Sequence, residues 1–459
     1  MPRAGGDCVS PSFRLTDFER LLGGPGAKLI ELISYMAQKK NLALYVAGGF
    51  VRDLLLNQRT LDLDFVLEGD AINFARSLAK SFGGYAHSHK QFGTAKWILD
   101  DSVAYSLSLI LDALPASVDF VTARSETYAF PTALPTVSPA DIECDLRRRD
   151  FSVNALAIQL SPLEEPWPLV DACDGIDDLK RGLIRALHEQ SFVDDPTRIL
   201  RALRYAERLG FTLESDSAEW MLAALPYLGR VTGQRLRNEI DLILREPRAG
   251  AILLRLQELG ALMNIHSAFR IRPQLPELFK RRRTLLPPWS SAVGDMRPVP
   301  PWSSTVGDMQ TPCWIALMTG INSVEVQSLC ERLALTNKLT EAITASARLA
   351  ERISLLDDPA IRPSQVARIL DEYPDIALQA NWLLAADSPT VQELIAAYAS
   401  DWRQRRQTIS GDDLKAMGLA PGPRYRQLLD RLRYAWIDGE VGSAQEEAAL
   451  LRQLLDSED

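Results

Sequence analysis

The sequence predicts an α+β head over residues 1–165, a small mixed sheet with helices, followed by an all-α remainder. Two observations predict this fold class. Through the first part, segments of period two alternate with segments of helical period, which is typical of strands interleaved with helices. After about residue 165 almost no strand pattern remains, and helical stretches follow one another. At 459 residues, the chain is long enough for about two to four domains.

The head can be followed element by element. Residues 26–40 have apolar side chains at helical spacing, and LALYVAGG at 42–49 is an apolar run that ends in two glycines. We expect a helix and then a short buried strand. The segment LDLDFVLE at 61–68 alternates apolar and acidic residues, which indicates a strand with one face toward the core. Further predicted helices are 51–57 and 70–82, and further predicted strands are 94–99 and 117–123.

A tandem repeat interrupts the helical half. PPWSS begins at residues 287 and 300, and VGDM begins at residues 293 and 306, so the period is thirteen residues. Two copies of so short a unit cannot stack into a solenoid. The repeat is rich in proline and serine, and we expect residues 284–312 to be a flexible surface insertion or linker. A docking motif that presents its tryptophans is the alternative.

Composition narrows the class of protein. The chain has a formal net charge of −9 and is 46% hydrophobic and 24% charged, as expected of a globular protein with a large core. This charge argues against a protein that coats nucleic acid, but it leaves room for a local basic groove. The five cysteines and four histidines show no zinc-ligand spacing. We expect a cytoplasmic protein without a membrane span, because neither a signal peptide nor a long apolar run is present.

Two aspartates stand out in GGFVRDLLLNQRTLDLDFV, residues 48–66. Residues two apart in a strand face the same side, so Asp62 and Asp64 project together with Cα atoms about 7 Å apart. Two carboxylates on a rigid strand can hold magnesium, which prefers one or two carboxylates together with phosphate oxygens. Two such ions would orient a triphosphate and activate an attacking hydroxyl.

A glycine turn precedes these aspartates. Gly48 and Gly49 would let the backbone approach a phosphate closely, and a helix that begins near residue 50 would point its amides at that anion. Arg52 could neutralise phosphate charge. Each feature alone is common, since an Asp-x-Asp pair usually lies on a solvated strand face and a glycine pair is mostly a turn. Their order here would bring both features to one end of a small sheet.

Three segments, in order along the chain, resemble one family. They are GGFVRDLLLNQRTLDLDFV at 48–66, DLRRRDFSVNALA at 145–157 and DDPTRILRALRYAERLGF at 194–211. Both their sequences and their spacing are similar to those of class II tRNA nucleotidyltransferases and bacterial poly(A) polymerases, within the polymerase-β-like nucleotidyltransferases. The resemblance implies a catalytic head over 1–165, a helical neck over 166–245 that carries the base-reading motif, and a helical body and tail over 246–459.

The resemblance implies roles for residues of the first two segments. The metal-binding catalytic carboxylates of the family are matched by Asp62 and Asp64. Asp119 is a candidate third carboxylate, for which a capping or structural role is the alternative. The triphosphate-binding turn is matched by Gly48, Gly49 and Arg52. The motif that contacts the ribose and phosphates is matched by Arg149, Asp150 and Asn154, with Arg148 beside them. Without the resemblance, the three arginines would indicate a solvated turn.

The third segment matches the family's base-reading motif. Asp195 and Arg198 are three apart on a predicted helix, so they share a face and can present acceptors and donors to a Watson–Crick edge. Cytosine and adenine both offer an exocyclic amine beside a ring-nitrogen acceptor, whereas uracil and guanine invert that pattern. Asp194 stands where the family usually has a glutamate. Helix capping with a salt bridge is the alternative role for the pair.

The helical remainder would hold RNA. Residues 409–441 resemble the tail of bacterial enzymes that add to tRNA ends. Two basic clusters are candidates for phosphate contacts, and a solvated helix face is the alternative for each. Their residues are Lys280, Arg281, Arg282, Arg283, Arg403, Arg405 and Arg406.

The resemblance therefore implies an enzyme that adds C and/or A nucleotides from CTP and ATP to the 3′ end of tRNA without a template, using two Mg2+ ions. It implies tRNA as the partner, and neither a membrane nor a stable protein partner. Poly(A) polymerase is an alternative, although the acidic end EEAALLRQLLDSED differs from the basic tail usual there. CC-only and A-only addition stay open, because residues 120–145 cover the loop linked to that difference. A non-catalytic RNA-binding protein and a protein-modifying nucleotidyltransferase are alternatives from other classes.

Overall fold

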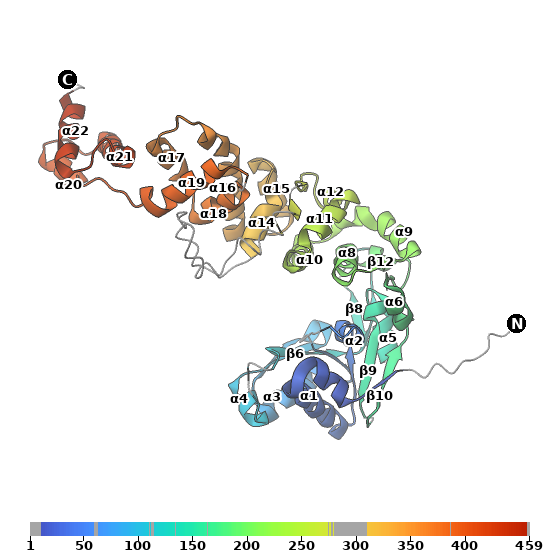
Figure 1. Ribbon diagram of the computed structural model, residues 1–459. Coiled ribbons are helices and arrows are strands. Elements are labelled where there is room, and N and C mark those ends of the chain that lie inside the picture. The colour runs from blue at the N-terminus through green and yellow to red at the C-terminus, as the bar shows by residue number, and fades with distance from the viewer. Residues whose placement is uncertain are drawn as a thin grey trace. The chain divides into compact units, whose positions relative to one another are not determined.

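The chain forms two compact units, Met1–Val231 and Thr232–Asp459, in the computed structural model (Figure 1). The boundary between them falls inside 166–245, the segment expected to be the neck. The structure describes residues 11–58, 63–109, 111, 114–133, 135–162, 164–273, 275–276, 279, 310–385 and 387–456. Asp62, the basic cluster 280–283 and residues 284–309 of the repeat therefore lie outside the described residues.

An eight-stranded sheet organises the first unit and confirms the mixed α+β head (Figure 1). Its strand order is β1-β10-β9-β2-β3-β6-β5-β4. β3 and β6 run parallel, and the other neighbours run antiparallel. The strands are β1 (Ser12–Phe13), β2 (Ala43–Ala47), β3 (Asp64–Glu68), β4 (Tyr85–His89), β5 (Thr94–Ile98), β6 (Ser117–Thr122), β9 (Leu156–Ser161) and β10 (Trp167–Asp171).

The two faces of the sheet are covered differently. On one face, α1 (Leu15–Lys39) and α3 (Ala71–Phe82) bury their apolar stripes in a core that includes Phe65 and Phe120. On the other face, α5 (Ile142–Arg147) packs against residues of the middle strands β2, β3 and β9. The outer strand β4 keeps every second side chain exposed. The sheet is thus open at one end of its second face.

Three short strands follow residue 165, where the sequence predicts helices. β10 pairs with β9, so the sheet extends past the expected end of the head. β11 (Leu183–Ile184) and β12 (Thr212–Leu213) pair with each other. Two-residue strands are too short to show a period of two, and β10 contains a proline, which weakens a strand signal.

Further elements of this unit are α2 (Gly49–Leu55), α4 (Asp101–Leu107), β7 (Arg124–Thr127), β8 (Thr136–Pro139), α6 (Gly175–Arg181), α7 (Ser191–Asp194), α8 (Thr197–Leu209) and α9 (Ser215–Ala224).

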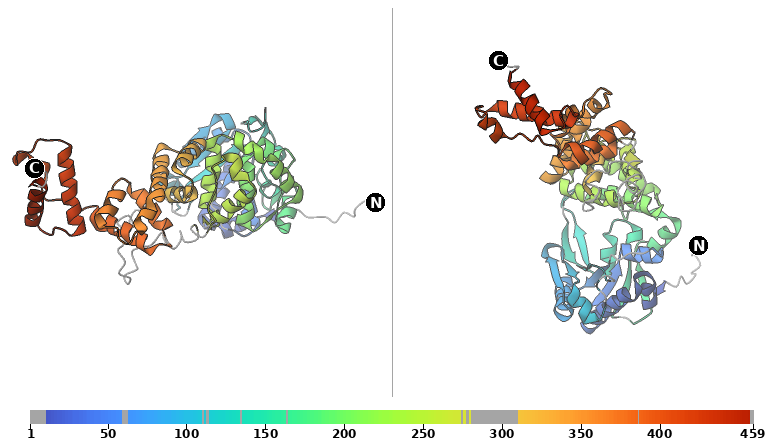
Figure 2. Two further views of the ribbon diagram at one scale, coloured as in Figure 1. Left: turned by 90° about the horizontal axis from the view of Figure 1, so that it is seen from above. Right: turned by 60° about the vertical axis from the view of Figure 1, so that its left-hand side comes forward.

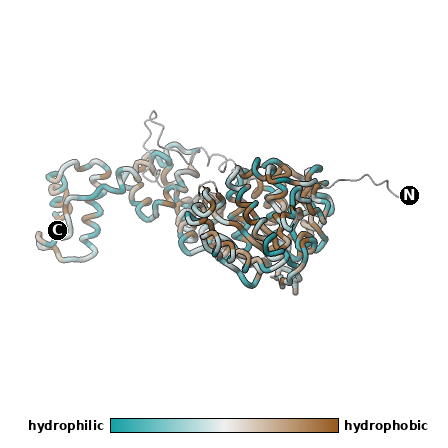
Figure 3. Tube along the Cα trace, turned by 90° about the horizontal axis from the view of Figure 1, so that it is seen from below, coloured by the Kyte–Doolittle hydropathy of each residue, from teal (hydrophilic) through white to brown (hydrophobic). Residues whose placement is uncertain are grey.

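The second unit contains helices and no strands in the part that the structure describes, as two further views show (Figure 2). Hydrophobic and hydrophilic residues alternate along these helices, as expected where one side of a helix is buried (Figure 3). No described helix is long and apolar enough to cross a bilayer. The helices are α10 (Gly233–Arg245), α11 (Ala249–Glu258), α12 (Ala261–Ile265), α14 (Gln310–Met318), α15 (Ser323–Arg332), α16 (Asn337–Arg352), α17 (Pro363–Leu370), α18 (Asp375–Leu384), α19 (Pro389–Ala397), α20 (Gly411–Ala416), α21 (Pro423–Asp438) and α22 (Ala444–Asp456).

The end of the predicted insertion belongs to a helix. α14 begins at Gln310, so residues 310–312 are helical rather than part of a surface insertion. The reason lies in the residues that follow, because Cys313, Trp314 and Ile315 are buried. The indole Nε1 of Trp314 also donates a hydrogen bond of 2.8 Å to Asp241 of α10. Burial of this apolar turn holds α14 in the second unit.

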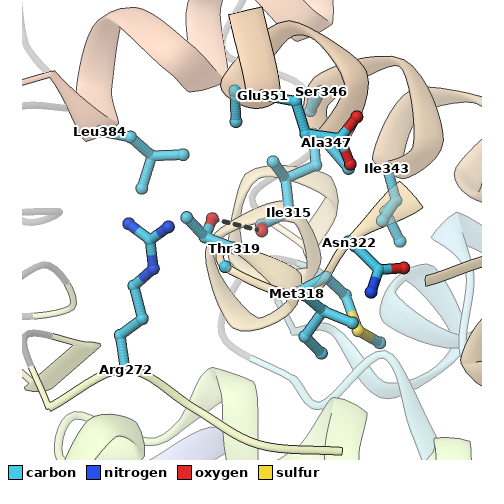
Figure 4. A pocket seen from close by; sticks show the side chains of 13 residues that line it. Arg272, Ile315, Met318, Thr319, Asn322, Ile343, Ser346, Ala347, Glu351 and Leu384 are labelled. Carbon is cyan, nitrogen blue, oxygen red and sulfur yellow. Dashed lines mark hydrogen bonds between the residues drawn. The ribbon is translucent and has the colours of Figure 1, made fainter. Parts of the chain in front are cut away.

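A cavity of about 230 Å³ lies between helices of the second unit (Figure 4). Its walls are mainly apolar and come from α14, α16 and α18, and the Arg272 side chain lies beside it. The Thr319 hydroxyl at its wall donates to the carbonyl of Ile315 at 2.9 Å. The buried Ser346 hydroxyl has no hydrogen-bond partner among the described residues. The helices therefore pack less completely here than in the core around Leu349.

Candidate active site

Strand registers bring several predicted site residues to one end of the sheet. Val46 of β2 pairs with Phe65 of β3, so the chain leaves β2 and enters the glycine turn beside Asp64. The Gly48 amide donates to the carbonyl of Leu156, where β9 begins, at 2.9 Å. The expectation that the acidic strand and the glycine turn meet at one end of a sheet is therefore met.

Two carboxylates lie side by side at this end. Asp64 and Asp119 are register partners on the parallel strands β3 and β6, and neighbouring strands lie about 4.8 Å apart. Both residues are partly buried. The ammonium of Lys96 on β5 contacts the Asp119 carboxylate at 2.6 Å. Asp119 is thus placed where a third carboxylate would have to be, and it also has a structural ion pair.

The donor set of this pair fits a hard cation. Carboxylate oxygens are the ligands that Mg2+ prefers, and one or two of them suffice when phosphate oxygens complete the shell. Within the described ranges, no group of three or more histidine, cysteine or acidic residues could hold a metal by itself. A metal bound by Asp64 and Asp119 would therefore take its remaining ligands from elsewhere, such as the nucleotide.

The glycine turn requires glycine at its first position. Gly48 has φ of +81°, and a Cβ atom there would lie 2.6 Å from Nη1 of Arg149. The turn is thus packed directly against the second predicted motif. Any larger residue would displace that arginine or strain the backbone.

The Arg52 side chain does not point into solvent at the glycine turn. Its side chain is buried, with 2% of the residue exposed. Nε and Nη2 donate to Asp53 at 2.8 and 2.6 Å, and Nη1 donates to Oδ1 of Asn154 at 2.6 Å. In this structure Arg52 therefore links α2 to the second motif instead of presenting a free cation to phosphate.

The second motif is held by carboxylates rather than solvated. Arg148 and Arg149 both bind Asp145, whose side chain is fully buried. Arg148 also binds Glu126 of β7 at 2.9 Å. Glu126 in turn accepts hydrogen bonds from Arg124 and from the Tyr128 hydroxyl. This network connects the motif to the segment expected to influence which nucleotides are added.

Asp150 and Asn154 meet, but not as neighbours on an α-helix. Their separation of four residues would let them share one face of a helix, but the chain forms a short 3₁₀ turn over Ser152–Asn154 instead. Asn154 Nδ2 still donates to Oδ1 of Asp150 at 3.0 Å. The other carboxylate oxygen accepts Nε and Nη2 of Arg201 at 2.9 and 2.5 Å. Hydrogen bonds from Asn154 and Arg201 thus hold the Asp150 carboxylate beside the turn.

Asp150 predicts a pH effect on stability. Burial alone would raise its pKa, but Arg201, the Asn154 amide and Arg198 together lower the pKa to about 2. An unfolded aspartate titrates near 3.9, so the stabilisation is complete above about pH 4 and is lost as the pH falls toward 2. We expect Asp150→Asn to cost about 2–3 kcal/mol of stability at pH 7, and the difference to shrink below pH 4. Thermal unfolding of both proteins across this range measures it, and a pH-independent difference would contradict it.

The third motif differs in geometry from the predicted shared helix face. α8 begins at Thr197, so Asp195 precedes it. Its carboxylate accepts hydrogen bonds from the Thr197 amide and hydroxyl, at 3.0 and 2.5 Å. Arg198 lies inside α8 and is only 6% exposed. Its guanidinium donates to Ser191 Oγ at 2.5 Å and to the carbonyl of Arg148 at 2.9 Å.

Three residues of α8 belong to this site and were not predicted. The Tyr205 ring lies 4.7 to 5.9 Å from the guanidinium carbons of Arg52, Arg201 and Arg204, and it contacts Phe151 edge to face at 6.0 Å. The spacing could have revealed Arg201 and Tyr205, since 198, 201 and 205 share one helix face. In the sequence, the apolar residues between them indicate only a packed helix. Cation–π contacts of this kind fix the guanidinium groups in place.

The basic cluster at 403–406 is largely engaged. Arg403 contacts Asp375, and Arg405 contacts Asp401 at 2.7 Å. Arg406 donates from Nη1 to the carbonyls of Arg403 and Arg405. A role in phosphate contact stays a prediction for these residues and for the undescribed cluster 280–283.

Comparison with known proteins relates this geometry to one family. Residues 44–185 match the family model described as Poly A polymerase head domain, and residues 210–270 match the one described as probable RNA and SrmB-binding site of polymerase A. A CC-adding tRNA nucleotidyltransferase of Deinococcus radiodurans is 30% identical over 415 residues, which cover 90% of this chain and 89% of that protein. The chain belongs to the tRNA nucleotidyltransferase family.

Other tRNA nucleotidyltransferases align over most of the chain. An A-adding enzyme of Halalkalibacterium halodurans is 28% identical over 93% of this chain and 92% of its own length. An A-adding enzyme of Geobacter sulfurreducens is 31% identical over 95% of this chain, which spans 48% of that relative. Among solved structures, a CCA-adding enzyme in an apo form has a TM-score of 0.74 at 27% identity, covering 97% of this chain and 100% of that one. The tRNA nucleotidyltransferase fold thus extends over both units.

Proposed function

We propose that this protein adds C and/or A nucleotides from CTP and ATP to the 3′-hydroxyl of tRNA and releases pyrophosphate. The observation that carries the proposal is the Asp64–Asp119 pair at the sheet end where the glycine turn begins. Solved structures of similar CCA-adding enzymes are described as complexes with ATP, with CTP and with tRNA. Their chemistry supports the same substrates here.

Each group of the site has a part in this reaction. Asp64 and Asp119, together with Asp62 as the family motif implies, would hold Mg2+, which would orient the triphosphate and favour the attacking hydroxyl. The turn at Gly48 and Gly49 allows close approach of the phosphates. Asp150 and Asn154 fix the segment that contacts the ribose. None of these groups needs a template strand.

Base choice is assigned to the third motif. Asp195 and Arg198 would offer an acceptor and donors to the Watson–Crick edge of the incoming base. Arg198 is anchored by Ser191 and the Arg148 carbonyl, so its remaining N–H groups are held in a fixed direction. A fixed donor set accepts cytosine and adenine and opposes uracil and guanine.

The proposal leaves three products to distinguish, because the relatives include A-adding, CC-adding and CCA-adding enzymes. We also propose a cytoplasmic location, because the described cysteines form no disulfide, as is usual in a reducing compartment. The test is extension of tRNA transcripts that end before CCA, after the first C and after CC, with each nucleotide alone and with CTP plus ATP.

The products, sized at single-nucleotide resolution, separate the candidates. Two C and one A followed by a stop indicate a CCA-adding enzyme. Addition of C without A, or of A only after CC, indicates one half of a divided pathway. A long A ladder indicates a poly(A) polymerase. Absence of extension with Mg2+ present would leave a non-catalytic RNA-binding protein and refute the proposal.

A further inference from the structure

One row of polar side chains leads from the catalytic carboxylates to the edge of the sheet. Asp64 pairs with Asp119, Asp119 pairs with Lys96 on β5, and Lys96 pairs with His87 on the edge strand β4. Register partners on neighbouring strands point to the same face. Four strands thus present a continuous row of ionisable groups on one face.

The part of this face over β4 and β5 is exposed. Helix α3 covers the opposite face, where Ala95 and Trp97 of β5 are buried. On the open face, Tyr85 is 60% exposed and His87 and His89 are also exposed. The two imidazole rings lie 4.8 Å apart at an interplanar angle of 67°. We call Tyr85, His87, His89 and Lys96 the outer sheet face.

The chemistry of the outer sheet face suits unpaired RNA. Aromatic rings stack with bases irrespective of sequence, and cations meet the phosphates between them. His87 lies about 10 Å from Asp119, since two strand spacings separate them. A ring at that distance is within reach of a nucleotide next to the one whose hydroxyl lies at the carboxylates. Lys96, which is exposed and contacts Asp119 at 2.6 Å, is the positive charge of this face nearest to the carboxylates.

We infer that the outer sheet face binds the unpaired 3′ end of the RNA acceptor, with the bases that precede the reacting nucleotide stacked on His87 and His89. This inference rests on the proposed function. It assigns to β4 and β5 a binding role that is separate from nucleotide selection by α8. Substitutions in the outer sheet face should weaken RNA binding without changing the affinity for CTP or ATP.

The test uses the full-length chain with His87→Ala and His89→Ala combined. Fluorescence anisotropy measures its Kd for a labelled tRNA transcript ending in CC and for the same transcript without its unpaired 3′ nucleotides, both without nucleotide. We expect about tenfold weaker binding of the first RNA and unchanged binding of the second. In extension assays, KM for the RNA should rise by a similar factor while KM for the nucleotide stays constant.

Two further variants serve as a control and as a test of whether aromatic rings restore binding. Tyr105→Ala is the matched control, because Tyr105 is 89% exposed on α4, whose buried Val103 belongs to the core on the covered face; its RNA binding should equal the parent's. His87→Phe with His89→Phe retains the rings and should restore most of the affinity for RNA with an unpaired end.

Several outcomes would overturn the inference. They are equal loss of affinity for both RNAs, no loss for either, or failure of the phenylalanine variant to restore binding. A change of oligomeric state in sedimentation velocity, with RNA affinity unchanged, would show that β4 is instead an edge for contacts between copies of the chain. If the parent protein extends no transcript, the proposed function itself has failed; if it extends them and the histidine variant behaves identically, only this inference has failed.

Discussion

An Asp64→Ala variant should add nucleotides about a thousandfold more slowly than the parent, or slower still, because a carboxylate ligand contributes several kcal/mol through the metal it holds. The fold should persist. Asp64 lies at the start of β3, and the buried residues Phe65 and Leu67 that hold this strand in the core are unchanged. Single-turnover extension of the CC-ending transcript at saturating nucleotide measures the chemical step directly.

The control for Asp64 is another aspartate of the same unit. Asp101→Ala removes an exposed carboxylate from the first turn of α4 and should leave the rate near that of the parent. Asp62→Ala should resemble Asp64→Ala, as its sequence position predicts. A rate for Asp64→Ala within tenfold of the parent, with an unchanged melting temperature, would remove Asp64 from the metal site.

Arg198→Ala should relax base choice more than it weakens binding of the triphosphate. A guanidinium that reads a base edge contributes about 1–3 kcal/mol of discrimination, so selectivity for the preferred base should fall by about fivefold to a hundredfold. Arg198 is buried and donates hydrogen bonds to Ser191 and to the carbonyl of Arg148, so some stability is lost as well. The measurement is kcat/KM for each of the four nucleotides on each transcript.

Two further substitutions distinguish base recognition by Arg198 from the contacts that hold its side chain in place. Ser191→Ala removes one anchor but keeps the guanidinium, so it should lower selectivity less than Arg198→Ala. Arg198→Lys keeps the charge but loses the planar fork and should behave like the alanine variant. If the four nucleotides were ranked as in the parent, with equal losses for each, Arg198 would be structural and another group would read the base.

The sequence was most informative where function depends on strand register. Alternation of Leu63, Asp64 and Phe65 predicts which side chain leaves the core, and the structure has this strand where it was expected. It was least informative where a side chain is turned by a distant partner. Arg52 points inward because Asn154 accepts its hydrogen bond, and these residues are 102 positions apart. No local pattern predicts such a contact.

Contacts between residues far apart in the sequence also explain the other differences between the predicted and the observed elements. Asn154 ends a 3₁₀ turn rather than a helical turn, and Asp150 beside that turn is held by Arg201, 51 positions away. Helical spacing between two residues shows only that they can share a face, not that a helix forms there. Very short strands such as β11 exist because a partner strand supplies their hydrogen bonds. Partners of this kind are visible only in three dimensions.

The hydrogen bonds from α8 back to the second motif limit where this chain can be cut and rejoined. Arg198 and Arg201 both reach the segment 148–150, although the match to the head-domain model ends at residue 185. A hybrid joined at residue 185 would therefore combine α8 of one protein with Asp150 of the other. The arginines of α8 and the segment 148–150 would then come from different proteins, and their buried contacts would no longer match. A junction next to Val231, where the first compact unit ends, transfers both sides of these contacts together. Modular exchange between members of this family should follow that boundary.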